Sequence, residues 1–231
     1  MRWAGAILRR SCRMAAPGPS VAHRPQTFLL QLTPDDGIVV GVKERSVMAP
    51  APLVTTDEYL RTPETLQPTE VIYGAPRVAE APTVRHQQAL CAFLLALAPH
   101  VRRHRLGTVL PSPLDVILDY GRALILQPDL VFISNARLDI LKQDRVMGAP
   151  DMVLDVLSPH PRIGKLQQRI DWFAQYGVRE IWLLHQLKEQ IQILSVTNGR
   201  IVGSESFDYL TPIRSGVLPE FTPRLEDILA E

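Results

Sequence analysis

Three acidic residues interrupt stretches of the sequence that otherwise look like buried β-strands. Glu70 stands directly before an apolar pair, Asp129 before the run Leu130–Ile133, and Asp155 inside the run Met152–Leu157. A buried carboxylate without a partner is costly. Because no basic residue is interleaved in these runs, we expect the three acids to share a cation. Hard oxygen ligands from separate strands, together with a strand carbonyl, make a Mg²⁺ or Mn²⁺ site of the kind used in phosphoryl chemistry.

Each of these acids has an ordinary alternative interpretation. A single acid at the end of a strand usually accepts a hydrogen bond from a turn amide or pairs with an arginine. For each acid considered alone, that interpretation is favoured. Taken together and in this order, the three acids favour a shared functional site.

Basic residues follow the third acid. The helix expected after Asp155 carries Arg169 at the flank of its apolar stripe, and Lys165 lies one turn earlier on the same side. Both side chains are long enough to reach back toward the sheet edge and neutralise negative charge there. The alternative is that they lie along the rim of the helix with their charged ends in water.

The elements that must position these residues follow from hydrophobic periodicity and turn signals. We expect helices at 56–60, from Pro82 to about Arg105, at Pro161–Tyr176 and at Leu225–Leu229, and strands at 70–73, 114–118, 123–126, 130–133, 152–157, 181–184, 190–196 and 201–207. The middle of the second helix is apolar nearly all round, which predicts burial on more than one side. Asn198-Gly199 is a strong hairpin turn signal. Helices and strands in this order predict one α/β or α+β domain with a mixed sheet.

The net charge of the 231 residues is +1, and this total hides an asymmetry. Residues 1–34 hold five arginines and no acid, so residues 35–231 hold 20 basic against 24 acidic side chains. We expect an N-terminal extension over 1–47, disordered over 1–25 and with a possible hairpin over 26–43, followed by one domain over 48–231. An organelle-targeting peptide is the alternative for the arginine-rich start, but a cytoplasmic protein is the favoured interpretation.

Composition excludes several classes of protein. The two cysteines, Cys12 and Cys91, cannot build a disulfide framework or a structural zinc site, and Cys91 is expected in the core. The longest apolar run, Ala89–Pro99, is too short to cross a membrane. Near-neutral charge argues against a protein coated in basic surface for bulk nucleic-acid binding.

A set of short segments extends this interpretation. The segments are 56–60 (TDEYL), 70–74 (EVIYG), 86–87 (HQ), 114–116 (LDV), 127–131 (QPDLV), 148–151 (GAPD), 155–159 (DVLSP) and 176–182 (YGVREIW). In this order and spacing, from about Met48 to the C-terminus, the chain resembles a widespread, mostly bacterial family of predicted endonucleases. The family has a PD-(D/E)xK, restriction-endonuclease-like core. The resemblance implies a central mixed β-sheet flanked by helices, with a C-terminal β-hairpin extension.

The resemblance also implies roles for single residues. Glu70 matches the first-strand glutamate of the family, and Asp129 matches the metal-binding aspartate of its Pro-Asp motif. Asp155 stands where the family usually has glutamate. Arg169 stands at the family's active-site lysine, and Lys165 at a position that is often aspartate.

The resemblance therefore predicts a Mg²⁺-dependent (or Mn²⁺-dependent) endonuclease that acts on DNA. Asp129, Asp155 and Glu70 would hold the metal with help from the Val156 carbonyl, and a homodimer is plausible. Arginine stays protonated, so Arg169 can stabilise charge but cannot act as a base. Alternatively Lys165 takes over this role, or catalysis is lost.

Two other functions remain open at this point. One is a catalytically degenerate nuclease fold that serves as a binding module. The other is a metal-dependent hydrolase of a small phosphoester. We expect packing or helix capping, rather than a site role, for His86.

Overall fold

The computed structural model describes residues 52–63, 67–79, 81–157 and 166–230. These residues belong to one compact unit, Ala49–Glu231. The expected extension over 1–47, with its possible hairpin, lies outside the described residues, and so does Lys165.

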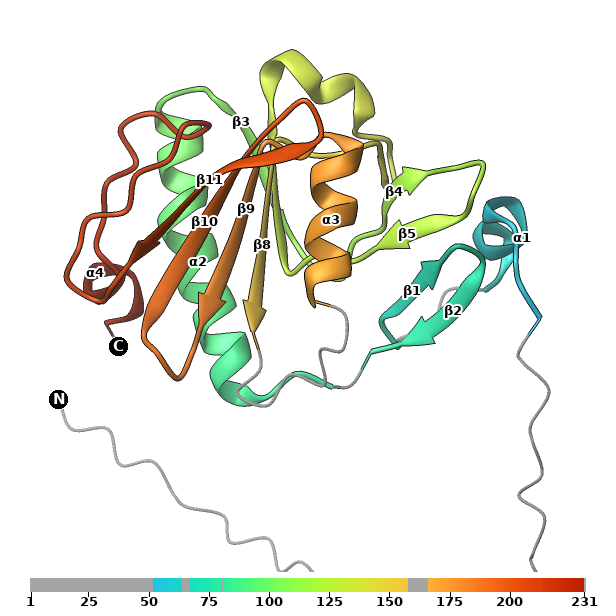
Figure 1. Ribbon diagram of the computed structural model, residues 1–231, viewed down its shortest axis with the longest axis horizontal. Coiled ribbons are helices and arrows are strands. Elements are labelled where there is room, and N and C mark those ends of the chain that lie inside the picture. The colour runs from blue at the N-terminus through green and yellow to red at the C-terminus, as the bar shows by residue number, and fades with distance from the viewer. Residues whose placement is uncertain (1–51, 64–66, 80, 158–165, 231) are drawn as a thin grey trace, which may run out of the picture. The chain divides into compact units, whose positions relative to one another are not determined.

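The described residues form short strands and helices in mixed order (Figure 1). The helices are α1 (Thr56–Arg61), α2 (Val84–Arg103), α3 (Leu166–Tyr176) and α4 (Leu225–Leu229), with a 3₁₀ helix, η1, at Asn135–Ile140. The strands are β1 (Thr69–Ile72), β2 (Ala75–Val78), β3 (Gly107–Pro111), β4 (Val116–Asp119), β5 (Leu124–Leu126), β6 (Leu130–Ser134), β7 (Val146–Met147), β8 (Met152–Leu157), β9 (Glu180–His185), β10 (Gln190–Thr197) and β11 (Arg200–Phe207).

The strands form two mixed sheets. The larger sheet has the order β11-β10-β9-β8-β6-β3, and only β8 and β9 in it are parallel. The smaller sheet has the order β2-β1-β5-β4-β7. The expected mixed α+β architecture is therefore confirmed, with two sheets in place of one central sheet. The expected C-terminal hairpin is β10–β11, which continues the larger sheet to its edge.

Helices cover both faces of the larger sheet, α2 on one and α3 on the other (Figure 1). Successive side chains of a strand point to opposite faces. Along β8, Leu154 therefore packs with the core on the α2 side, and Val153 packs with the core on the α3 side. Asp155 belongs to the same alternating row as Val153. This position directs its carboxylate to the face covered by α3.

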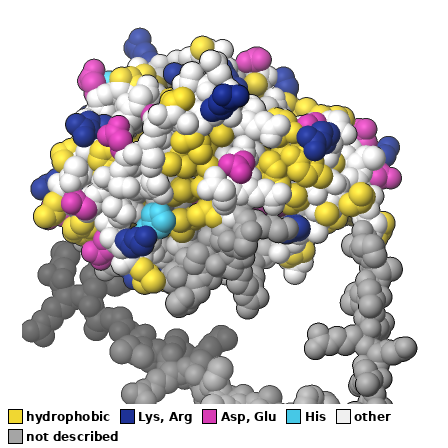
Figure 2. Space-filling view, viewed as in Figure 1, with side chains coloured by type: hydrophobic (Ala, Val, Ile, Leu, Met, Phe, Trp, Pro, Cys, Tyr) yellow, Lys and Arg dark blue, Asp and Glu magenta, His cyan; other side chains and the backbone are white. Residues whose placement is uncertain are grey.

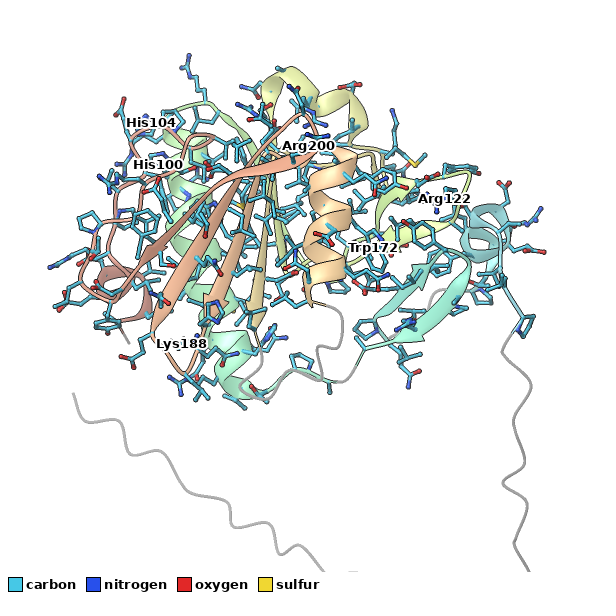
Figure 3. The ribbon with its side chains drawn as sticks, in the orientation of Figure 1. His100, His104, Arg122, Trp172, Lys188 and Arg200 are labelled. Carbon is cyan, nitrogen blue, oxygen red and sulfur yellow. The ribbon has the colours of Figure 1, made fainter. Side chains whose placement is uncertain are left out.

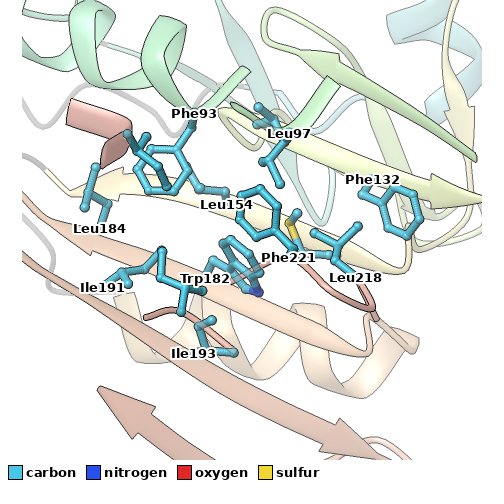
Figure 4. Packing of buried hydrophobic residues seen from close by; sticks show 14 of the residues in the cluster. Phe93, Leu97, Phe132, Leu154, Trp182, Leu184, Ile191, Ile193, Leu218 and Phe221 are labelled. Atoms are coloured by element: carbon cyan, nitrogen blue, oxygen red, sulfur yellow. The ribbon is translucent and has the colours of Figure 1, made fainter. Parts of the chain in front are cut away.

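The core on the α2 side is built from large apolar residues of every layer (Figure 4). Phe93 and Leu97 of α2 and Trp182 of β9 are fully buried there. Leu218 and Phe221, from the segment before α4, close this core. Burying such side chains is the main favourable contribution to folding.

The far side of α2 is exposed, contrary to expectation. Leu95 is 74% exposed, and Cys91, expected in the core, is also exposed. The prediction of burial on more than one side was wrong because, among the described residues, no layer covers that side of the helix.

Local sequence signals account for the β10–β11 turn and for the start of α1. The Asn198-Gly199 turn joins β10 and β11, and both residues have positive φ (52° and 74°), as a two-residue hairpin turn requires. Helix α1 is capped by Thr55, whose side chain accepts the N–H of Glu58. None of the helices among the described residues combines the length and the apolar character that a membrane span needs.

Two leucines of α2 provide a matched test of this packing. Leu97 has no exposed surface, whereas Leu95 is 74% exposed. We expect Leu97→Ala to lower the free energy of unfolding by about 2–5 kcal/mol, because it leaves a cavity in the core. Leu95→Ala should change it by no more than about 0.5 kcal/mol. Urea unfolding followed by circular dichroism measures both, and equal effects would contradict the assignment of the two faces.

Candidate active site

Arg169 lies at the centre of the candidate site and pairs with Asp155. Its Nε donates to Asp155 Oδ2 at 2.7 Å, and its Nη2 lies 3.4 Å from Oδ1. Asp155 faces α3 because of the alternation along β8, and Arg169 is on the first turn of α3 described. The guanidinium carbon also lies 5.1 Å from the ring centroid of Phe173, one turn later on α3. The guanidinium is thereby held between the carboxylate of Asp155 and the ring of Phe173.

Glu70 reaches the same arginine from the smaller sheet. Its Oε1 accepts a hydrogen bond from Arg169 Nη1 at 2.5 Å and another from the backbone N–H of Gln127 at 2.8 Å. Glu70 is on β1, and Gln127 directly follows β5, the neighbour of β1 in the sheet. One guanidinium therefore joins carboxylates from both sheets.

Asp129 lies beside this ion pair but is held by other groups. Its Oδ2 accepts the backbone N–H of Val156 at 2.7 Å, and its Oδ1 lies 3.1 Å from Nε2 of His86. The backbone N–H of Asp129 in turn points to Asp155 Oδ1 at 3.4 Å. The sequence interpretation assigned the Val156 carbonyl to a metal, whereas the contact observed is through the Val156 N–H. A carboxylate only accepts hydrogen bonds, so Nε2 of His86 carries the proton.

His86 is the site residue for which sequence reasoning expected only packing or capping. It is in the first turn of α2, where its backbone N–H is capped by the side chain of Thr83. This position brings the ring to Asp129, 43 residues away in the sequence. The hydrogen bond with Asp129 raises the pKa of His86, although burial opposes this effect. The available signal was the place of His86 in the family-matching segment 86–87 (HQ).

Arg169 remains positively charged in this environment. Burial by itself lowers the pKa of the guanidinium, but the charges of Asp155 and Glu70, with their hydrogen bonds, outweigh burial and raise the pKa. Arg169 therefore stays protonated at every physiological pH. It stabilises negative charge and does not accept protons.

A second layer of contacts positions Gln127. Its Nε2 donates to Asp115 Oδ1 at 2.8 Å, and the hydroxyl of Tyr59 lies 3.2 Å from the same oxygen. Burial, followed by the charge of Asp115, raises the pKa of Tyr59, so this hydroxyl remains a donor. Gln127 is thereby held with its backbone N–H on Glu70.

Aromatic packing sets the distance between β1 and α3. Tyr73, directly after β1, meets Trp172 of α3 edge-on, with ring centroids 5.7 Å apart. The guanidinium carbon of Arg122 lies 4.2 Å from the centre of the Tyr73 ring. Figure 3 labels Trp172 on α3 and Arg122 in the turn between β4 and β5. This contact joins the end of β1 to α3, the two elements that carry Glu70 and Arg169.

A cavity of about 370 Å³ adjoins the cluster. Glu70, Gln127 and Asp129 lie on its wall, with His86 from the start of α2. Glu70 and Asp129 of the cluster are therefore accessible from the cavity to a small molecule or to part of a larger one.

The donor chemistry of the cluster suits a hard divalent cation, because three carboxylates converge on one region. In the ranges that the structure describes, however, no group of three or more His, Cys, Asp or Glu residues is arranged to hold a metal ion. The oxygens of Asp155 are engaged by Arg169, and those of Asp129 by Val156 and His86. A metal that took these oxygens would have to displace the guanidinium from Asp155.

Four of the five residues singled out in the sequence thus meet in one cluster: Glu70, Asp129, Asp155 and Arg169. Lys165, the fifth, lies outside the described residues. Their roles in metal binding and catalysis stay predictions.

Comparison with known proteins agrees with this architecture. Residues 56–226 match the family model "Uma2: Putative restriction endonuclease". The fold is similar to the crystal structure of a protein from Anabaena variabilis described as "a putative nuclease belonging to DUF820". The TM-score is 0.63 and the identity 19%, and the match covers 76% of this chain and 97% of that chain. No curated protein matches.

The family match spans most of the chain and every residue of the cluster. The resemblance found in the sequence motifs is therefore confirmed. The chain belongs to the Uma2 family of restriction-endonuclease-like proteins.

Proposed function

We propose that this protein hydrolyses phosphodiester bonds of DNA at the cluster of Glu70, Asp129, Asp155 and Arg169. The observation that carries the proposal is the convergence of three carboxylates and one arginine, from two sheets and a helix, beside a cavity. Carboxylates that bind a divalent cation and an arginine that binds phosphate are groups suited to metal-assisted phosphodiester hydrolysis.

A divalent cation belongs to this proposal. Asp129, Asp155 and Glu70 would hold Mg²⁺ or Mn²⁺, and the ion would supply Lewis-acid activation of water and neutralisation of phosphate charge. Because Arg169 cannot accept a proton, activation of water depends on the ion rather than on this side chain. His86 holds the carboxylate of Asp129 in place through its Nε2–H.

Arg169 has two sets of partners in this scheme. Its guanidinium is now paired with Asp155 and Glu70. Guanidinium groups bind phosphate oxygens, like those of a carboxylate, in a bidentate manner, so a phosphate that displaced one of these carboxylates could take its place. Arg169 would then neutralise the negative charge that develops on the pentacovalent phosphorus.

The surface charge suits weak rather than tight engagement of DNA. On the face shown in Figure 2, basic and acidic side chains are interspersed, and no broad region of one sign is present. Few phosphate contacts are therefore expected outside the site, and binding should weaken steeply with salt.

Plasmid nicking tests the proposed activity. With Mg²⁺ or Mn²⁺, the purified protein should convert supercoiled plasmid to the nicked form, measured on agarose gels. Asp129→Asn keeps the shape of the side chain but removes its charge, and should slow nicking on the order of 100-fold or more. Linear product in addition to nicked product would indicate that two copies act together, as expected for a homodimer.

The matched control is Asp171→Asn. Asp171 is an exposed carboxylate on α3 that accepts a hydrogen bond from Gln167 and contacts no member of the cluster by any bond described. Its substitution should leave nicking unchanged. Nicking that persists undiminished in Asp129→Asn would contradict the assignment of the site.

A second candidate function is a nuclease-fold binding module without catalysis. The observation that favours it is the ion pair itself, because Arg169 already neutralises the two carboxylates that a metal would need. In this case the protein would bind DNA without cutting it.

Calorimetric titration with Mn²⁺ separates the two functions. If the guanidinium competes for the carboxylate oxygens, Arg169→Gln should bind Mn²⁺ about tenfold more tightly or better, because its side chain is uncharged. Measurable binding by the unaltered protein favours the nuclease, whereas binding by Arg169→Gln alone favours the binding module. Arg214→Gln, at an exposed ion pair with Glu205, is the control and should behave like the unaltered protein. Equal affinities of the unaltered protein and Arg169→Gln would show that the guanidinium does not compete.

A further inference from the structure

Helix α2 presents an apolar surface on the side that faces away from the core. Val84 and Leu95 are 77% and 74% exposed, and Cys91 is exposed as well. From His86 to Pro99 the helix contains no Asp, Glu, Lys or Arg, although the outer face of a surface helix is normally polar or charged. A contiguous apolar surface of this kind indicates contact with another molecule.

The outward positions of α2 are spaced so that a second copy of the same helix fits them. Steps of four and three residues alternate along this surface, which keeps its members in one line on a helix. A two-fold interface needs a surface that is complementary to itself. In an antiparallel pair, Cys91 of one copy meets Leu95 of the other, and Gln88 meets Ala98. The members, which we call the outer ridge, are Val84, Gln88, Cys91, Leu95, Ala98 and Arg102.

A cavity lies on each flank of the outer ridge, and Leu95 belongs to the walls of both. The cavity between α2 and α4 has a volume of about 650 Å³, and the one between α2 and β3 about 510 Å³. A ridge with a groove on either side is the surface on which a second helix packs. A stable dimer buries about 800 Å² per copy. The ridge alone, roughly 30 Å long and 10 Å wide, offers less than this, so the walls of both cavities take part.

Charge decides the direction in which two copies pair. The cavity beside α4 flanks the first half of α2 and has two acids on its wall, Glu189 and Asp227, with Arg85. The cavity beside β3 flanks the second half and has Arg102 and Arg105 on its wall, with no acid among the described residues. No ion pair within the described residues engages Glu189, Arg102 or Arg105. A parallel pair would bring like charges together, whereas an antiparallel pair brings the basic half of each helix to the acidic cavity of the other.

We propose that the outer ridge of α2 joins two copies of this chain, antiparallel and related by a two-fold axis, into a homodimer. Each copy then covers the apolar surface of the other, with Cys91 and Leu95 at the centre of the contact. The inference goes beyond the proposed function and does not rest on it, because the ridge contains no residue of the acidic cluster. It gives the homodimer that the sequence made plausible a contact surface.

The mass of the full chain in solution tests this interface. By sedimentation equilibrium we expect the mass of two chains at about 100 µM and dissociation on dilution to submicromolar concentration. Leu95→Glu places a charge in the apolar centre twice per dimer, so the dissociation constant should rise at least about 100-fold, tenfold for each copy. Val202→Glu, at a 65% exposed position of β11, lines neither cavity and should leave the dimer intact. Circular dichroism checks that both variants keep the fold.

Disulfide cross-linking tests the antiparallel register. In a Cys12→Ser background, Leu95→Cys places a second thiol opposite Cys91 of the other copy, so mild oxidation should give a covalent dimer on non-reducing gels. Within one helix the Cβ atoms of these two positions are about 5–6 Å apart, too far for a disulfide. Val84→Cys in the same background places its thiol opposite Arg102 and should not cross-link.

Three outcomes would contradict the inference. A single-chain mass at the higher concentration would overturn it and leave the ridge to a different occupant. A dimer that persists in Leu95→Glu would show that another face makes the contact. Cross-linking of the Cys12→Ser protein alone, through Cys91, as fast as with Leu95→Cys would overturn the antiparallel register. These measurements use neither DNA nor metal, so the dimer can stand where plasmid nicking fails, and the reverse.

Discussion

A single guanidinium neutralises two carboxylates that the chain brings from different sheets, and the geometry of the site depends on this interaction. Glu70 comes from the smaller sheet and Asp155 from the larger one, and Arg169 of α3 binds both. Partly buried charges are tolerated only when they are paired and hydrogen-bonded. The planar guanidinium meets this condition because its donors can serve two carboxylates at once. The packing of Tyr73 on Trp172 and the N–H of Gln127 on Glu70 keep the two acids at the separation that one arginine can span. Helix α3 thus couples the two sheets through charge as well as through its apolar face.

The acids of the site and the arginine near them could be predicted from the sequence, but not the pairing between them. A carboxylate inside an apolar run needs a partner, and this argument alone brought Glu70, Asp129 and Asp155 together. The sequence also placed Arg169 where it could reach the sheet edge and neutralise charge. It did not show that the guanidinium would bind Asp155 directly and join it to Glu70, which lies 99 residues from Arg169 in the chain. For each acid considered alone, the sequence suggested an arginine as partner. For the three acids together it suggested a shared metal ion. The structure shows one arginine shared by two of the acids. The partner of Asp129 was missed for a similar reason, because His86 is at the start of a helix whose placement depends on the core.

Secondary-structure elements that depend on local sequence signals were predicted, whereas those that depend on distant pairing partners were not. Helix α4 and the β10–β11 hairpin were predicted closely, since their apolar pattern and their turn or boundary signals are local. Strands β2, β3 and β7 were not predicted. They are short, and two of them contain proline or glycine. Their strand character comes from partners distant in the chain, such as β6, whose residues pair with β3 residues at least 19 positions away. The exposure of Leu95 could not be predicted because apolar composition does not reveal whether a second layer of structure will cover a helix.

Strand β8 is apolar on both faces, and this has a consequence for how faithfully the chain folds. A strand with one apolar face resists slippage, because a shift by one residue would expose that face to water. In β8 such a shift would exchange one apolar row for another at little cost in burial, except at Asp155. There it would turn a carboxylate into the core on the α2 side, away from Arg169 and without a partner. The acidic residue therefore penalises misaligned pairing of β8 with β6 and β9, so the residue proposed for chemistry also selects the native alignment.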